Sequence, residues 1–272
     1  MQFDEECNCA IIVSVQRLRK MATGGSYWEM YDSYCSRSNL RELFVPALNK
    51  VASECDFDSV MSCSAIGPGD GFYEMEVIKK CAPNVTKITA VENDQESIER
   101  FKVNLRKMLP DIDGRMVEGD FRGWDGPSEP SDLVCMFHVL YYVGRQSLLS
   151  KAHDRWLKPG GYLAVMSASR TTMPRNPYEI FGRLGTPVTP WEDIEADILN
   201  VGFVRKHAYE IQYERDFTNP DESYLRFFLS HVDRPDTCTG TLDDVRMVME
   251  ELFPGGKTDQ GFTMLAVFQK AP

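Results

Sequence analysis

The stretch SAIGPGDGF, residues 64–72, decides the fold. An apolar run precedes it and an amphipathic run follows it, which predicts a strand, a tight turn and a helix. Gly67, Gly69 and Gly71 allow backbone torsions that other residues avoid, and they let a ligand approach the backbone closely. An ordinary strand-to-helix turn is the alternative, but glycine at three alternate positions favours a turn that binds a ligand.

Strands and helices alternate from residue 59 onward, which predicts a parallel sheet with helices on both faces. The expected strands cover residues 59–66, 87–92, 115–118, 132–137, 162–167, 204–217 and 262–269. The expected helices cover residues 72–81, 95–108, 148–157, 222–232 and 242–252. A further helix is expected to start with Thr189 as its cap and Pro190 in its first turn, and to end at Gly202.

The composition is that of an ordinary globular protein, with 43% hydrophobic and 26% charged residues among 272. A formal net charge of −11 argues against nucleic acid as a partner, because binding phosphates needs a basic face. No apolar run is long enough for a membrane span, and we recognise no secretion signal. We therefore expect a cytoplasmic monomer that acts on a small molecule, without nucleic acid or membrane partners.

Residues 1–24 form an extension that is either a short helix or disordered, and residues 25–272 are expected to form one domain. In that domain Tyr27, Tyr31 and Tyr34 fall on one face of a helix. Pro46 should kink or divide the next helical pattern. The eight cysteines fit no zinc-ligand spacing, so we expect free thiols and no bound metal.

Glu92 ends the second expected strand, 25 positions after Gly67. A carboxylate at this place can accept hydrogen bonds from both hydroxyls of a ribose. Asp94 and Glu96 lie nearby, but they fall in the following turn or helix. A solvated helix cap is the alternative role for an acidic residue here.

The third expected strand leads into Glu118-Gly119-Asp120-Phe121. The segment Lys158-Pro159-Gly160-Gly161 forms the turn before the fifth strand. With the glycine turn and Glu92, these signals resemble the class I S-adenosylmethionine-dependent methyltransferases. That resemblance implies that Asp120 contacts the adenine amino group and Phe121 stacks on the ring, although Asp120 can equally stabilise a turn. A nicotinamide dehydrogenase is disfavoured, because Phe72 stands where its fingerprint needs glycine.

The segment MFHVLYYV, residues 136–143, resembles the histamine N-methyltransferase family. YWEMY at 27–31, FVPAL at 44–48, AVE at 90–92 and VTPWED at 188–193 match the same family. The resemblance implies a Rossmann-like α/β fold with a seven-stranded, mostly parallel sheet whose last strand is antiparallel. It also implies a small helical and loop cap over the substrate, expected from residues 25–55 and 170–190.

By this resemblance the cofactor is S-adenosylmethionine, with S-adenosylhomocysteine as its product and no metal. The expected cofactor contacts are Gly67, Pro68, Gly69, Glu92, Ser97, Asp120, Phe121 and Phe137. The expected substrate contacts are Tyr27, Tyr31, His138, Tyr141 and Tyr142. His138 and Tyr142 are the candidates for catalysis, because a histidine can accept a proton from the acceptor group. A satisfied buried histidine, and tyrosines that only pack helices together, are the alternatives.

The substrate pocket departs from the family at three positions. The family's glutamine stands as His138, its glutamate as Leu40 with Glu42 two residues on, and its C-terminal asparagine as Gln260 or Gly261. We therefore expect transfer of a methyl group to a nitrogen of a small amine or imidazole compound, with histamine not the best substrate. An oxygen or carboxyl acceptor, or a catalytically silent S-adenosylmethionine-binding protein, is the alternative.

Overall fold

The computed structural model describes residues 26–140, 144–169, 177–184, 188–231, 241–256 and 259–272. The chain divides into two compact units. We call one the sheet unit, which comprises Leu40–Thr172, Thr189–Tyr213 and Phe262–Pro272. We call the other the helical unit, which comprises Met1–Asn39, Met173–Val188 and Glu214–Gly261. The extension at residues 1–24 lies outside the described residues.

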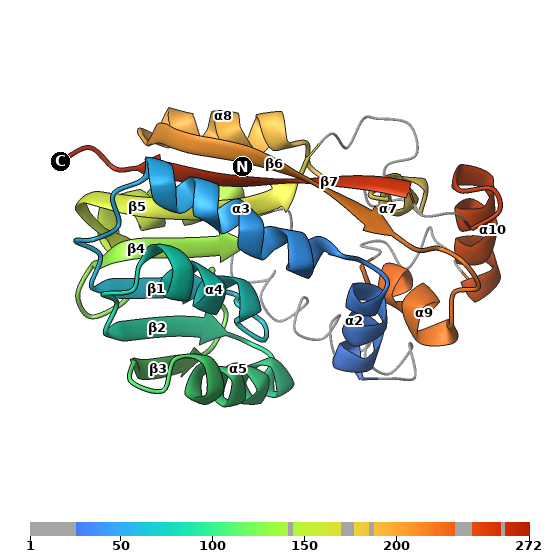
Figure 1. The fold of residues 1–272 in the computed structure, drawn as a ribbon, viewed down its shortest axis with the longest axis horizontal. Coiled ribbons are helices and arrows are strands. Elements are labelled where there is room, and N and C mark those ends of the chain that lie inside the picture. The colour runs from blue at the N-terminus through green and yellow to red at the C-terminus, as the bar shows by residue number, and fades with distance from the viewer. Residues whose placement is uncertain (1–25, 141–143, 170–176, 185–187, 232–240, 257–258) are drawn as a thin grey trace, which may run out of the picture. The chain divides into compact units, whose positions relative to one another are not determined.

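Seven strands form one sheet: β1 (Ser62–Ile66), β2 (Lys87–Glu92), β3 (Asp113–Glu118), β4 (Ser131–Phe137), β5 (Leu157–Ala168), β6 (Val204–Arg215) and β7 (Asp259–Gln269). Their order is β3-β2-β1-β4-β5-β7-β6, as Figure 1 shows. Neighbours from β3 to β5 pair in parallel, whereas β7 runs antiparallel to β5. The expectation of a mostly parallel sheet with an antiparallel last strand is confirmed.

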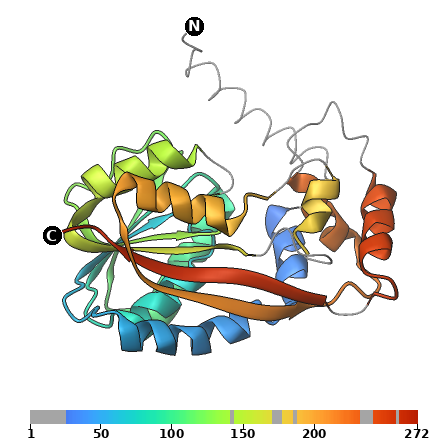
Figure 2. The same cartoon turned by 90° about the horizontal axis from the view of Figure 1, so that it is seen from above.

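Helices cover both faces of the sheet (Figures 1 and 2). The helices α3 (Leu40–Glu54), α4 (Phe72–Cys81) and α5 (Gln95–Met108) lie on one face, and α6 (Arg145–Lys151), the π-helix η1 (Ala152–Trp156) and α8 (Trp191–Val201) lie on the other. Side chains alternate along a strand. Cys135 and Phe137 of β4 therefore pack in the core on the face of α3, α4 and α5, and Val134 and Met136 pack in the core on the face of α6, η1 and α8. Burial on both faces explains why β4 is apolar throughout.

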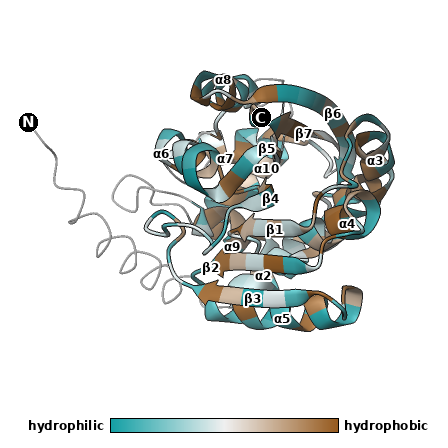
Figure 3. Cartoon of the chain, turned by 90° about the vertical axis from the view of Figure 1, so that its left-hand side faces the viewer, coloured by the Kyte–Doolittle hydropathy of each residue, from teal (hydrophilic) through white to brown (hydrophobic). Residues whose placement is uncertain are grey.

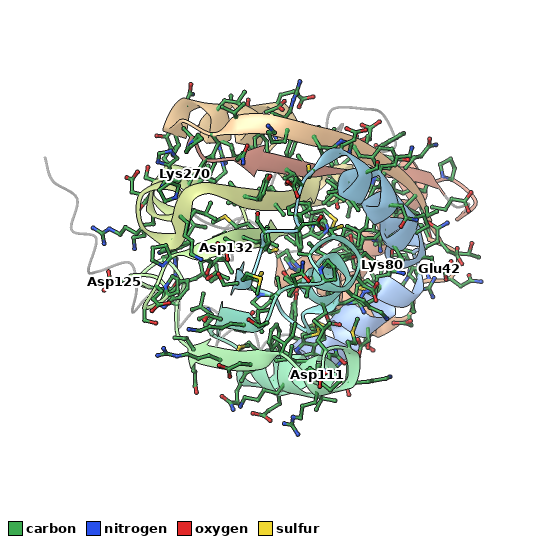
Figure 4. The ribbon with its side chains drawn as sticks, turned by 60° about the vertical axis from the view of Figure 1, so that its left-hand side comes forward. Glu42, Lys80, Asp111, Asp125, Asp132 and Lys270 are labelled. Atoms are coloured by element: carbon green, nitrogen blue, oxygen red, sulfur yellow. The ribbon has the colours of Figure 1, made fainter. Side chains whose placement is uncertain are left out.

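Helices α5 and α8 each carry both apolar and polar residues in Figure 3. On α5 the buried residues Ile98, Phe101 and Leu105 recur at helical spacing, as the sequence predicts. At the opposite end of the sheet from the glycine turn, Asp132 of β4 (Figure 4) joins the beginning of β1 to the beginning of β5. Its carboxylate accepts hydrogen bonds from Ser62 N at 3.0 Å and from Lys158 Nζ at 2.7 Å.

Pro46 lies inside the continuous helix α3, so of its two expected effects the division of the helix does not occur. Other local predictions differ from the structure. Thr189 does not cap α8: Pro190 is the N-cap residue, and the Thr189 hydroxyl accepts a hydrogen bond from Arg145 Nη1 at 3.1 Å. Gly202 does end α8, in a left-handed conformation. The segment 170–190, expected as part of the helical and loop cap, contains a short helix, α7 (Glu179–Arg183).

The fifth strand begins earlier than expected. Helix α6 continues into η1, which ends at Trp156, and β5 starts directly at Leu157. The residues Pro159, Gly160 and Gly161 belong to β5, where the register with β4 shifts between Ser131 and Leu133. The glycines therefore accommodate a bulge within the strand rather than a turn before it.

The helical unit contains α2 (Tyr27–Ser36), α7, α9 (Glu222–Ser230) and α10 (Leu242–Leu252). Its core includes the fully buried Trp28, Tyr224 and Phe228. Helix α3, from the segment 25–55 expected in the substrate cap, belongs to the sheet unit. None of the helices in the described part of the chain combines the length and apolarity that crossing a membrane requires.

Candidate active site

The glycine turn connects β1 to α4 in the sheet unit. Gly67, Gly69 and Gly71 all have positive φ angles, of 57°, 58° and 72°. Gly67 N donates to Val91 O at 2.9 Å, which ties the turn to β2. A Cβ atom on Gly67 would lie 3.2 Å from both Phe121 Cε1 and Val139 Cγ2. The turn therefore needs glycine for its torsions and for the close approach of the segments after β3 and β4.

Glu92 is buried at the end of β2, with only 7% of its surface exposed. Its carboxylate accepts hydrogen bonds from the backbone of Gly69 at 3.2 Å, Asn93 at 2.8 Å and Asp94 at 3.1 Å. Burial raises the pKa of Glu92, and these three N–H donors oppose the rise. The side chain is thus fixed beside the glycine turn, at the place where a ribose would meet the end of β2.

The residues after β3 take different roles from one another. The Phe121 ring lies against Gly67, and its stacking on adenine stays a prediction. The Asp120 carboxylate pairs with the Arg122 guanidinium, whose Nε lies 2.9 Å from both carboxylate oxygens. Partial burial acts to raise the pKa of Asp120, but the bonds and charge of Arg122 outweigh it and lower that pKa. A contact between Asp120 and adenine stays a prediction.

His138 directly follows β4 and has a φ angle of 55°. Among the described residues only His138 and Asn219 combine a side chain with a positive φ. His138 N donates to Met166 O at 2.8 Å, and its ring meets the Tyr73 ring edge to face at 5.8 Å. Unusual backbone torsions held by surrounding structure are frequent at functional sites. His138 is half-buried at the carboxyl end of the sheet, where ligands bind in such folds.

Two other predicted cofactor residues make structural contacts. The Ser97 hydroxyl donates to Asp94 Oδ2 at 2.8 Å, inside the cap of α5. Phe137 packs in the core against Phe44 and Tyr73. The predicted residues Tyr141 and Tyr142 lie outside the described part of the chain.

Three charged residues next to the turn were not predicted. Asp70, inside the turn, accepts a hydrogen bond from Arg41 Nη2 of α3 at 2.8 Å. The Arg41 guanidinium lies over the Phe72 ring at 4.7 Å. Glu74 in the first turn of α4 is 1% exposed, and its Oε2 has no hydrogen-bond partner among the described residues. Burial raises the Glu74 pKa to about 8, and the negative charges of Asp70 and Glu92 add to the rise. A hydrogen bond from the backbone N–H of Glu74 itself acts to lower the pKa but does not offset the rise.

The predicted substrate tyrosines belong to the helical unit. Tyr27 and Tyr31 stack with their ring centroids 5.8 Å apart, and both approach Phe227 of α9. Tyr27 is 37% exposed, whereas Tyr34 stacks on Phe227 at 4.0 Å and takes a structural role. Glu29 of α2 accepts a hydrogen bond from Ser26 N in the helix cap, and Glu42, in the sheet unit, is exposed on α3 (Figure 4).

The arrangement fits S-adenosylmethionine. Gly67 lets Phe121 and Val139 pack closely against the turn, Glu92 offers a buried carboxylate to which ribose hydroxyls could bond, and Phe121 is an aromatic residue next to both. No group of three or more His, Cys, Asp or Glu side chains within the described ranges is arranged to hold a metal ion. The strand order, the antiparallel β7 and this turn define the fold of class I S-adenosylmethionine-dependent methyltransferases.

Comparisons with known proteins agree with this class. Residues 65–165 match the methyltransferase domain family. A predicted methyltransferase of Bacillus halodurans C-125 has the same fold, with a TM-score of 0.63, 14% identity, and 84% of this chain and 99% of that one covered. Geranyl diphosphate methyltransferase, solved in complex with S-adenosylmethionine, has a TM-score of 0.51 at 10% identity and covers 84% of each chain.

A curated relative is the carboxy-S-adenosyl-L-methionine synthase of Shewanella piezotolerans, 32% identical over 103 residues. The match spans 37% of this chain and 41% of that protein. The matched part of this chain thus spans less than half the length of that relative. Together these findings agree with a methyltransferase domain that includes residues 65–165.

Proposed function

We propose that this protein transfers the methyl group of S-adenosylmethionine to a nitrogen of a small amine or imidazole compound. The observation that carries the cofactor half of the proposal is the buried Glu92 carboxylate bonded to the glycine turn at Gly69. When bound, S-adenosylmethionine supplies a sulfonium methyl group for in-line displacement. The protein's contribution is to bind the nucleoside and to hold the acceptor nitrogen about 3 Å from the methyl carbon.

The acceptor half rests on His138 and the tyrosines. His138 lies at the end of β4, and a ring nitrogen can accept the proton that the acceptor nitrogen loses. Tyr27 and Tyr31 present stacked rings, which suit a planar or cationic substrate. In the proposal Tyr141 and Tyr142, which follow His138 in the sequence, complete the contacts to the acceptor.

Histamine is not the best substrate in this proposal. A pocket that hydrogen-bonds one substrate discriminates steeply, because a missing partner leaves polar groups unpaired. His138 in place of glutamine changes which hydrogen-bond donors and acceptors lie next to the substrate that receives the methyl group. Glu42 is exposed, and Glu29 is used in a helix cap, so neither repeats a dedicated carboxylate for the amine.

The test is methyl transfer from isotope-labelled S-adenosylmethionine to a panel of imidazoles, arylethylamines, amino acids, phenols and carboxylic acids. We expect methylated product from a nitrogen compound, with histamine below the best substrate in kcat/KM. Product only from phenols or acids would overturn the nitrogen acceptor. Binding without product across the panel would favour a silent binding protein. A Glu92→Gln variant controls for product that arises without the cofactor site.

A further inference from the structure

The glycine turn has a cation next to it that the proposed function does not yet use. Arg41 is the second residue of α3, and its side chain is 30% exposed. Asp70 anchors the guanidinium through a bond of 2.8 Å, and the rings of Phe72 and Tyr73 lie beneath it at 4.7 and 5.8 Å. Contacts with the turn and with the first residues of α4 therefore fix its position.

The order of the strands gives the direction in which a bound nucleoside would run. Phe121 follows β3, Glu92 ends β2, and Gly67 follows β1. With adenine at Phe121 and ribose at Glu92, the rest of the molecule must continue toward the ends of β1 and β4. The amino-acid group of S-adenosylmethionine, which carries an ammonium and a carboxylate, then lies at the turn that contains Asp70.

The charges at this turn are unfavourable for a ligand carboxylate unless a cation meets it. Asp70 lies in the turn, and Glu74 and Glu92 are buried beside it. A guanidinium is planar and presents several donors, so it pairs with a carboxylate in a two-bond geometry that a lysine cannot reproduce. Arg41 stands beside the acidic turn with this chemistry.

We propose that Arg41 recognises the carboxylate of the amino-acid group of the bound cofactor, and that Asp70 is a positioning residue for its guanidinium. This inference rests on the proposed function, because it assumes that the nucleoside binds along these strand ends. It makes Arg41 the residue that distinguishes S-adenosylmethionine from nucleosides without an amino acid. A purely structural ion pair between α3 and the turn is the competing role.

The experiment is calorimetric titration of the full chain with three probes: S-adenosylhomocysteine, its decarboxylated analogue and 5′-methylthioadenosine. The wild-type protein should bind S-adenosylhomocysteine about tenfold or more tightly than the decarboxylated analogue. Arg41→Gln should weaken the binding of S-adenosylhomocysteine by about tenfold or more, and should change the affinity for the other two probes by less than about twofold. Arg41→Lys should fall between, because it keeps the charge without the paired bonds.

Arg100→Gln is the matched control, since Arg100 on α5 has a similar side-chain exposure and pairs with Glu96. An equal loss of affinity for all three probes in Arg41→Gln would show that Arg41 forms a purely structural ion pair, and would overturn the inference. Equal wild-type affinity for the first two probes would overturn it without any variant, so a variant that fails to fold does not decide the outcome. If the wild-type protein binds none of the probes, the proposed function itself fails.

Discussion

The backbone N–H of Gly69 donates a hydrogen bond to Glu92 Oε2 over 3.2 Å. The bond joins the turn after β1 to the end of β2, two strands that lie side by side and parallel. It places the carboxylate that we propose for a ribose against the backbone of the glycine turn. Turn and carboxylate therefore form one site, and a change in either should affect binding of the same ligand.

Gly67→Ala should reduce both stability and binding. Its positive φ costs an alanine about 1–2 kcal/mol, and the new methyl group would press on Phe121 and Val139 at 3.2 Å. Gly160→Ala is the matched control, because Gly160 has a φ of 74° but no atoms within 4 Å of the added Cβ. Chemical denaturation should show losses in both variants, whereas affinity for S-adenosylhomocysteine should fall only in Gly67→Ala. Unchanged affinity in Gly67→Ala would contradict the position of the site.

Glu74 should make the folded state less stable as pH rises. Its folded pKa of about 8 lies above the ordinary value of 4.5, so between these values the folded state binds more protons than the unfolded state. The free energy of unfolding then falls as pH rises through this window and levels off above about pH 8.

Replacing Glu74 with glutamine should remove this fall. The free energy of unfolding of Glu74→Gln should therefore exceed that of the wild type by on the order of 1 kcal/mol or more at pH 8, and by less at pH 5. Urea denaturation at the two pH values measures the difference. Glu99→Gln, at an exposed position of α5, should leave the pH dependence of the wild type in place. A gap between Glu74→Gln and wild type that stays constant with pH would show that Glu74 does not titrate in this way.

His138→Asn should separate chemistry from binding. Asparagine tolerates a positive φ better than most residues, so the backbone after β4 should be kept while the imidazole is lost. If His138 accepts the proton, kcat should fall by about 10²–10³-fold while the affinity for S-adenosylhomocysteine stays within about twofold. His153→Asn, at a histidine bonded to Asp154 in η1, is the control. Full activity of His138→Asn would assign His138 a structural role.

Tyr31→Leu should weaken binding of the methyl acceptor and leave binding of the cofactor unchanged. The Tyr31 ring stacks on Tyr27, and loss of an aromatic contact with a cationic or planar substrate costs about 0.5–2 kcal/mol. We expect KM for the best acceptor to rise about two- to thirtyfold with kcat nearly unchanged. Tyr34→Leu should instead lower the melting temperature, because Tyr34 packs on Phe227 and under Arg215. A KM that does not change in Tyr31→Leu would remove this residue from the substrate contacts.

The core of the sheet unit could be predicted from the sequence because its signals are local. The glycine turn follows an apolar strand directly, and α4, α5 and α10 have the predicted boundaries. Glu92 could be found by its distance from the turn along the chain. Its bond to Gly69 is a consequence of the parallel pairing of β1 with β2.

Other features depend on residues far apart in the sequence. Arg41 and Asp70 are separated by 29 positions, and only the packing of α3 against α4 brings them together. Thr189 has the composition of a helix cap, but Arg145, 44 positions away, occupies its hydroxyl. The bulge at Pro159–Gly161 looks like a turn in the sequence, because the same residue types serve both. The positive φ of His138 has no sequence signal at all.

The most direct test of the account is calorimetric titration of the full chain with S-adenosylhomocysteine, together with Glu92→Gln and the exposed control Glu99→Gln. We predict saturable binding at one site with a Kd in the micromolar range or tighter. Glu92→Gln should bind about 10–100-fold more weakly, the scale of a lost charge-assisted pair of hydrogen bonds, and Glu99→Gln should match the wild type. No heat and no thermal shift at a ligand concentration of about 1 mM would contradict the central claim.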